Sequence, residues 1–218
     1  MDISRNIRDV EQHIAAAARK AGRDPDEITL VAVTKGLPAQ AIEAAITAGI
    51  HNIGENRVQE AHSKIAQLST SGVRPTWHMI GHLQRNKVKT AMEIFDIIHS
   101  VDSLRLADEI NSKAPQILPV LLQVNVSSEV TKSGFSVSEL PEALKYIRAM
   151  PNLEAKGLMT IAPMARDPEE VRPVFRALRE LRDSLGLDHL SMGMTDDFEV
   201  AIEEGATMVR IGRAIFGG

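Results

Sequence analysis

The chain has 218 residues, a formal net charge of −4 and no cysteine, which excludes disulfides, thiolate metal sites and a cysteine nucleophile. Its hydrophobic content of 44% is ordinary for a globular protein, but only 3% of the residues are aromatic, so we expect an aliphatic core. Neither a basic, aromatic-rich patch nor an apolar run of membrane-spanning length occurs, so we expect a cytoplasmic protein that binds neither nucleic acid nor membrane.

Residues 1–22 predict an amphipathic helix, because Ile3, Ile7, Val10 and Ile14 recur at helical spacing and Gly22 stands where a C-cap belongs. Beyond this helix, short apolar runs alternate with helix-like segments. Strands are expected over residues 29–34, 51–54, 76–80, 97–100, 118–126, 154–160, 189–192 and 208–211. Helices are expected over residues 38–48, 57–68, 84–92, 103–114, 138–150, 168–185 and 196–204, with a looser segment at 127–135.

This alternation is typical of an α/β protein with a (β/α)8 TIM-like barrel, here a single domain over residues 1–218 with an extra N-terminal helix. A doubly wound open sheet is the alternative, because strand counts from one sequence are easily wrong by about one or two. In such a barrel the active face lies at the C-terminal ends of the strands. Glycine and polar residues gather at those expected ends, so we expect the site there.

Lys35 ends the first expected strand and is followed closely by Gly36 and Pro38, which stop a strand. A lysine at the end of a buried parallel strand is poorly solvated, which favours the neutral amine that attacks a carbonyl and forms a Schiff base. The alternative is a lysine that simply marks where the strand meets water. The strand alone does not decide between these interpretations.

The segment 191–197 leads from a strand into a helix. A small hydroxyl, a glycine and the free N–H groups of a first helical turn form an anion site, which predicts that Ser191 and Gly193 face a phosphate. The alternative is an ordinary helix N-cap at Thr195 or Asp196. Both interpretations are compatible if Asp197 caps the helix while Ser191 and Gly193 face the ligand.

Arg210 stands in the last expected strand and needs an acceptor, because a guanidinium carries only donors and keeps its proton. Gly212 lets the backbone approach a ligand closely. The alternative for Arg210 is a buried salt bridge to a barrel carboxylate such as Glu55 or Asp102.

His78 and His82 have the spacing of a metal-binding pair on a helix, but their segment predicts a strand followed by a loop, and no acidic third ligand lies nearby in the sequence. We therefore interpret His78 as a hydrogen-bonded residue of the barrel and expect no metal site.

Taken together, seven ordered segments resemble the pyridoxal phosphate homeostasis protein family, which is similar in turn to the barrel domain of alanine racemase. The segments are residues 31–35, 54–60, 77–87, 132–134, 157–159, 191–197 and 208–217. The resemblance implies that Lys35 holds pyridoxal 5'-phosphate (PLP) as an internal aldimine. It further implies phosphate contacts from Ser191 and from the backbone of Gly212 and Arg213, a pyridine-nitrogen contact from Arg210, and Asn56 at the edge of the cofactor.

Three positions depart from the pattern of that family. Gly36 stands where Thr is common, Arg57 where Tyr is common and His82 where Pro is common. These departures concern the mouth and its surface rather than the residues that would hold PLP.

The expected function is that of a non-catalytic PLP carrier. An arginine can only donate to the ring nitrogen, which therefore stays largely unprotonated and leaves PLP a weak electron sink. Tyr146 is the one tyrosine and falls in a predicted helix, whereas an alanine racemase-like enzyme takes a tyrosine acid/base from a second domain. We expect a monomer that serves PLP homeostasis, with apo forms of PLP enzymes as candidate acceptors.

Two alternatives stay open at this point. One is a single-domain PLP-dependent amino-acid racemase or lyase that uses Lys35 as its base. The other is a barrel that binds a phosphorylated metabolite and in which Lys35 forms no aldimine.

Overall fold

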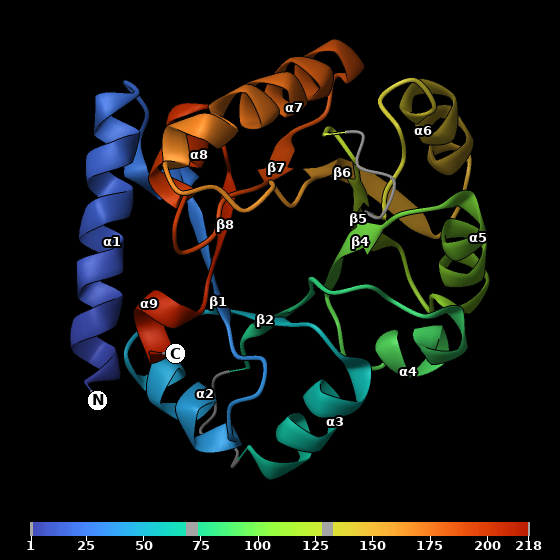
Figure 1. Cartoon of the computed structure of the whole chain (residues 1–218). Coiled ribbons are helices and arrows are strands. Elements are labelled where there is room, and N and C mark those ends of the chain that lie inside the picture. Colours follow the sequence, from blue (N-terminus) through green and yellow to red (C-terminus); the bar gives the residue numbers. More distant parts are fainter. Residues whose placement is uncertain (1, 69–73, 128–132, 218) are drawn as a thin grey trace.

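Eight parallel strands form a closed barrel in the order β1 to β8, and β8 pairs back onto β1 (Figure 1). The computed structural model describes residues 2–68, 74–127 and 133–217. The strands are β1 (Thr29–Val33), β2 (Asn52–Glu55), β3 (Thr76–Met79), β4 (Ile97–Val101), β5 (Leu118–Gln123), β6 (Leu153–Met159), β7 (His189–Ser191) and β8 (Met208–Ile211). The predicted barrel is confirmed, and the open sheet is wrong.

Helices surround the barrel on its outside (Figure 1). They are α1 (Ile3–Lys20), α2 (Ala39–Thr47), α3 (Val58–Gln67), α4 (Val88–Ala91), α5 (Leu104–Lys113), α6 (Leu140–Arg148), α7 (Arg172–Leu185), α8 (Phe198–Glu203) and α9 (Arg213–Phe216). The described residues also form three short 3-10 helices, η1 (Pro25–Glu27), η2 (Arg85–Lys87) and η3 (Pro168–Val171).

The core has two parts, because every strand of the barrel is covered on both faces. Apolar side chains between strands and helices form one large buried cluster. A second, smaller cluster joins Ile97, Leu121, Met159 and Met208 from β4, β5, β6 and β8. Side chains from strands on opposite sides of a barrel meet only through its interior, so this cluster fills the inside with an apolar layer.

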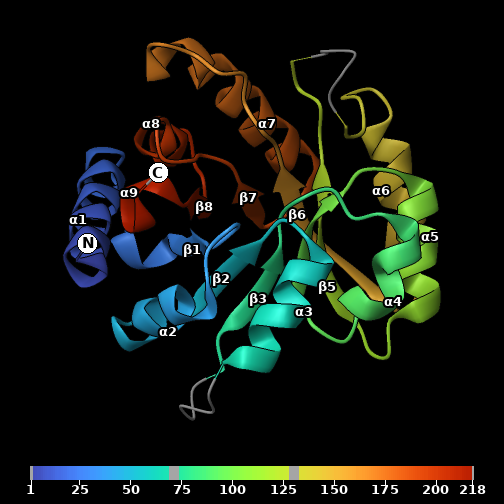
Figure 2. The ribbon, with the colours of Figure 1, turned by 60° about the horizontal axis from the view of Figure 1, so that its bottom comes forward.

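The predicted N-terminal helix is confirmed as α1, which lies alongside α8 and α9 in both views (Figure 2). Its apolar stripe, with Ile7, Val10 and Ile14, is buried. Asn6 donates its side-chain N–H to the carbonyl of Ile215 at 2.8 Å. The first helix of the chain therefore packs against the last.

Several predicted boundaries are wrong. The strand expected over 118–126 ends at Gln123, and Val124 forms an isolated bridge with Phe135. The helix expected over 84–92 divides into η2 and α4, and α9 follows the last strand without having been predicted. Lys132, in one of the seven segments, lies outside the described residues. Within the described ranges, no helix is long and apolar enough to cross a membrane.

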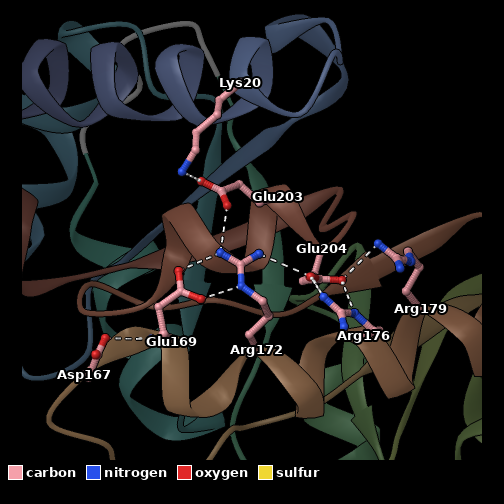
Figure 3. Close-up of polar contacts among 8 residues, drawn as sticks. All are labelled: Lys20, Asp167, Glu169, Arg172, Arg176, Arg179, Glu203 and Glu204. Atoms are coloured by element: carbon pink, nitrogen blue, oxygen red, sulfur yellow. Dashed lines mark hydrogen bonds and ion pairs between the residues drawn. The ribbon is translucent and has the colours of Figure 1, made fainter.

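An ion-pair network ties α7 to the end of α8 (Figure 3). Glu204 directly follows α8 and lies within 3.2 Å of Arg172, 2.9 Å of Arg176 and 2.9 Å of Arg179. The three arginines are spaced by four and three residues, so they project from one face of α7. Glu203 joins Arg172 at 2.7 Å. The network therefore fixes the short helix that follows the loop 192–197.

Lys20 extends this network to α1, with its ammonium group 2.6 Å from the carboxylate of Glu203 (Figure 3). On the other side, Arg172 binds Glu169 at 2.5 Å. The side chain of Glu204 is 5% exposed, whereas that of Glu169 is 56% exposed. Because water screens exposed pairs, Glu204 is the member on which stability depends most.

We expect Glu204→Gln to lower the free energy of unfolding by about 2 kcal/mol, because it leaves three arginines without their shared carboxylate. Urea denaturation of both proteins measures this difference. Glu169→Gln is the control and should cost clearly less, since its carboxylate faces water. Equal losses from the two variants would contradict the assignment.

The same network should depend on pH. Burial alone would raise the pKa of Glu204, but hydrogen bonds from Arg176 and Arg172 prevail and hold this pKa below its usual value of 4.5. A depressed folded-state pKa stabilises the protein above the unfolded-state value and loses that contribution as the pH falls through the folded value. The stability difference between wild type and Glu204→Gln should therefore shrink on acidification below about pH 4.5. A difference that is constant down to pH 3 would argue against it.

Candidate functional site

All the predicted site residues lie at the C-terminal ends of four neighbouring strands. The ladders pair Ser191 with Met208, Ala32 with Ile211 and Val33 with Gly54, so the order around this part of the barrel is β7, β8, β1, β2. The loops that follow these strands are therefore side by side on one face. Lys35, Asn56, Gly193 and Gly212 lie in these loops, whereas Ser191 and Arg210 belong to β7 and β8 themselves and Arg213 begins α9.

Lys35 occupies a tight turn just beyond β1. The N–H of Leu37 donates to the carbonyl of Thr34 at 3.1 Å, and Gly36 has φ +73°, as the third residue of a type II turn requires. The turn carries Lys35 outward, so its side chain is exposed and the predicted poorly solvated lysine is wrong. Within the described residues, Lys35 has neither an ion pair nor a hydrogen bond from its side chain.

A buried lysine holds the backbone on both sides of Lys35. The ammonium group of Lys64, from α3, donates to the carbonyl of Thr34 at 2.6 Å and to Glu55 Oε1 at 2.6 Å. It also pairs with Glu60 at 2.6 Å, and Glu60 accepts the N–H of Gly36. We call Glu55, Glu60 and Lys64 the α3 clamp. It fixes the turn that presents Lys35 while leaving the Lys35 side chain free.

The α3 clamp places its two carboxylates in different environments. Burial raises the pKa of Glu55, although hydrogen bonds from Lys64 and Thr34 partly oppose this. Burial also acts on Glu60, but hydrogen bonds from Lys64 and the Gly36 N–H prevail and lower its pKa. The sequence analysis missed this cluster. The available signal was Lys64 itself, which falls on the buried face of α3 with Val58 and Ala61.

Asn56, just after β2, carries a buried amide oxygen with no hydrogen-bond partner among the described residues. A Cβ on Gly81 would lie 2.3 Å from the Asn56 carbonyl, so only glycine permits this packing. A hollow of about 290 Å³ opens beside these two residues, over the ends of β2, β3 and β5. Because buried polar atoms in proteins are nearly always paired, the lone amide points to a missing partner at this mouth.

Arg210 is buried on β8, and among the described residues its side chain donates only to uncharged acceptors. It donates from Nη1 to Ser191 Oγ at 2.6 Å and from Nη2 to the carbonyl of Thr160 at 2.9 Å. The alternative of a salt bridge is wrong for both named carboxylates, because Glu55 pairs with Lys64 and Asp102 with His82. Burial lowers the pKa of Arg210 to about 10, so the guanidinium stays charged at neutral pH.

Ser191 is fully buried, and its Oγ lies between Arg210 and His99 Nδ1, which is 2.8 Å away. The phosphate contact predicted for Ser191 stays a prediction. His78 is confirmed as a hydrogen-bonded barrel residue, 2.9 Å from His99. His82 is exposed and turned toward Asp102 instead. Among the described residues, no group of three metal-ligating side chains occurs.

The backbone after β7 and β8 is held close to its neighbours. Gly193 has φ +92°, and its carbonyl accepts the N–H of Arg210 at 3.0 Å. A Cβ on Gly212 would lie 3.3 Å from the carbonyl of Val33, so the end of β8 lies directly against β1. Arg213 is exposed and pairs with Asp196.

The alternative of an N-cap at Thr195 or Asp196 is wrong, whereas the expectation that Asp197 caps the helix is confirmed. Asp197 occupies that position before α8, and its carboxylate accepts the N–H of Met194 at 2.6 Å. Burial raises the pKa of Asp197, and the nearby charge of Arg210 opposes this shift. The loop after β7 is therefore closed by a hydrogen bond within itself.

Comparison with known proteins agrees with this geometry. A family model described as alanine racemase, N-terminal domain, matches residues 3–218. The pyridoxal phosphate homeostasis protein of Aquifex aeolicus is 44% identical over 226 residues, covering 100% of this chain and 98% of that protein. The protein of the same name from Escherichia coli strain K12 is 44% identical, covering 99% of this chain and 96% of its own length.

A solved structure extends the likeness to three dimensions. PipY of Synechococcus elongatus, solved with PLP bound, is 36% identical and superimposes with a TM-score of 0.82, covering 94% of this chain and 100% of PipY. The resemblance carried by the seven sequence segments is thus confirmed over nearly the whole chain. The chain therefore belongs to the pyridoxal phosphate homeostasis protein family and has the alanine racemase N-terminal domain.

Proposed function

We propose that this chain binds PLP at the ends of β7, β8, β1 and β2, with Lys35 as the residue of covalent attachment, and that it serves PLP homeostasis. The observation that carries the proposal is the turn at Lys35, whose backbone is clamped while its amine has no partner among the described residues. The PLP bound in PipY, a relative at 36% identity, supports the same ligand here.

The residues of this face fit the functional groups of PLP. Lys35 offers an amine for the aldehyde, which forms a Schiff base with loss of water. Arg210 is charged and donor-only, as a contact to an unprotonated pyridine nitrogen requires. The glycine-containing loops after β7 and β8 suit a phosphate, which barrels of this class often bind there. The lone amide of Asn56 supports its place at the cofactor's edge.

Two features support binding without turnover. PLP supplies an electron sink when its ring nitrogen is protonated, and Arg210 has no proton to yield at neutral pH. Tyr146, the one tyrosine of the chain, is exposed on α6 and donates its hydroxyl to Asp108 at 3.1 Å. The Tyr146 side chain therefore lies on the outer surface, away from the proposed PLP site.

The exposure of Lys35 supports delivery as well as storage. A Schiff base forms reversibly, and one that faces solvent is open to exchange with other amines. Apo forms of PLP enzymes are the acceptors that we propose. A monomeric state and a cytoplasmic location stay predictions from the sequence.

Lys35→Ala should abolish the visible absorbance band that appears when PLP is added to the purified protein, because the substitution removes the attacking amine. Lys113→Ala, at the far end of α5, is the matched control and should keep the band. Retention of the band in Lys35→Ala would contradict attachment at Lys35, and absence of the band from the wild type would favour the alternative in which a phosphorylated metabolite binds without covalent attachment.

The PLP-loaded protein should neither racemise nor transaminate small amino acids above the rate of free PLP. Chiral chromatography of alanine, serine and lysine after long incubation measures this. Turnover that exceeds free PLP and disappears in Lys35→Ala would overturn the non-catalytic proposal and favour the racemase or lyase alternative.

A further inference from the structure

A continuous chain of polar side chains crosses the inside of the barrel. Asn52 Oδ1 lies 3.0 Å from His78 Nε2, and His78 Nδ1 lies 2.9 Å from His99 Nε2. His99 Nδ1 lies 2.8 Å from Ser191 Oγ, which accepts from Arg210 Nη1 at 2.6 Å. These five residues come from β2, β3, β4, β7 and β8. This row of hydrogen-bonded side chains, which we call the relay, begins at the first residue of β2. It ends at the face of the barrel that carries the site.

Both histidines of this relay are neutral. His78 is 3% exposed and His99 is 0% exposed. Burial lowers the pKa of His78 to about 4 and holds that of His99 well below 6.5, where the neighbouring His78 and Arg210 lower it further. At neutral pH each ring therefore has one N–H donor and one acceptor nitrogen.

The contacts then fix the direction of every hydrogen bond. The Asn52 oxygen can only accept, so His78 carries its proton on Nε2 and accepts at Nδ1. His99 must donate from Nε2 and accept at Nδ1. Ser191 therefore donates its hydroxyl proton to His99, and its lone pair accepts from Arg210.

The opposite direction requires a flipped Asn52 amide and leaves one group without a partner. His99 would then donate from Nδ1 to Ser191, which already accepts from Arg210. The Ser191 proton would need another acceptor, yet Ser191 is fully buried, and among the described residues its hydroxyl contacts only His99 and Arg210. An unpaired buried donor is costly, so the first direction is favoured.

We infer that His78 and His99 are positioning residues for the PLP site. They orient the Ser191 hydroxyl so that its oxygen accepts from Arg210, and so they hold the guanidinium where the proposed function places the pyridine nitrogen. The inference rests on that proposed function. It also assigns the Ser191 hydroxyl to the relay rather than to the phosphate. The phosphate is then bound by the loops that contain Gly193 and Gly212.

The first test is the tautomer of each histidine, read by ¹⁵N NMR on protein labelled at histidine nitrogen, at pH 7 and without PLP. We expect His78 and His99 both to carry the proton on Nε2 and neither to be an imidazolium. Assignment comes from loss of signals in His78→Gln and His99→Gln. A proton on Nδ1 of His99 would overturn the inference, whatever the protein binds.

The second test is a double-mutant cycle on PLP release. His99→Phe removes both ring nitrogens and should speed PLP release about tenfold, the factor that corresponds to 1.4 kcal/mol. If His99 acts through Arg210, the same substitution should have little further effect in an Arg210→Gln background. Ile97→Val, two residues earlier on β4 in the apolar layer, is the packing control and should leave release unchanged.

The outcomes separate the two proposals. Additive effects of His99→Phe and Arg210→Gln, with normal PLP binding by the wild type, would overturn the relay but not the function. A wild-type protein that binds no PLP would overturn both the function and the role of the relay in it. If His99→Phe is poorly folded, His99→Gln takes its place. Its side chain keeps one donor and one acceptor, so we expect it to restore slow PLP release in part. The inference would be contradicted if a folded His99→Gln protein, with the His78 tautomer unchanged, released PLP as fast as Arg210→Gln does.

Discussion

The hydrogen bonds between β8 and β1 close the barrel, and the site depends on them. Residues from the two ends of the chain meet there, in a ladder that runs from Thr29 opposite Met208 to Ala32 opposite Ile211. This pairing sets Arg210 and Gly212 beside the turn that carries Lys35. Helix α1 covers the same seam by packing on α8 and α9, as both ribbon views show (Figures 1 and 2). The N-terminal helix therefore protects the closure on which the site is built.

A buried guanidinium is the most demanding feature of this arrangement. An isolated charge in a dry interior is strongly destabilising, and no carboxylate bonds directly to Arg210 among the described side chains. Two neutral oxygens, from Ser191 and Thr160, accept its protons instead. Each such bond to a charged donor contributes about 1.5–3 kcal/mol, and a chain of hydrogen bonds behind Ser191 polarises it further. The neutral histidines thus help to stabilise a buried cation that bonds directly to no carboxylate among the described residues.

The strands could be predicted from the sequence because they lie in short, mainly apolar runs bounded by glycine or polar residues, most clearly at β1 and β5. Side-chain direction could not. Lys35 lies two residues past β1 in a turn, and this turn exposes it although the preceding strand is buried. His99 and Lys64 acquire their roles from partners on other strands and helices, so spacing along the chain could place Lys64 on the buried face of α3 but could not identify the partners of either residue. The short α9 was missed because four residues show no periodicity.

Two charged clusters hold the backbone beside the site, which explains why the site can be rigid without being closed. The α3 clamp fixes the backbone around Lys35, and Glu204 with its three arginines fixes α8 behind the loop after β7. Both hold backbone rather than ligand, so the strand ends stay in place while the Lys35 amine remains free in solvent. A catalytic PLP site gains from excluding water around the reacting groups. A site that must release its cofactor gains from the opposite arrangement, and rigid loops around an exposed lysine supply it.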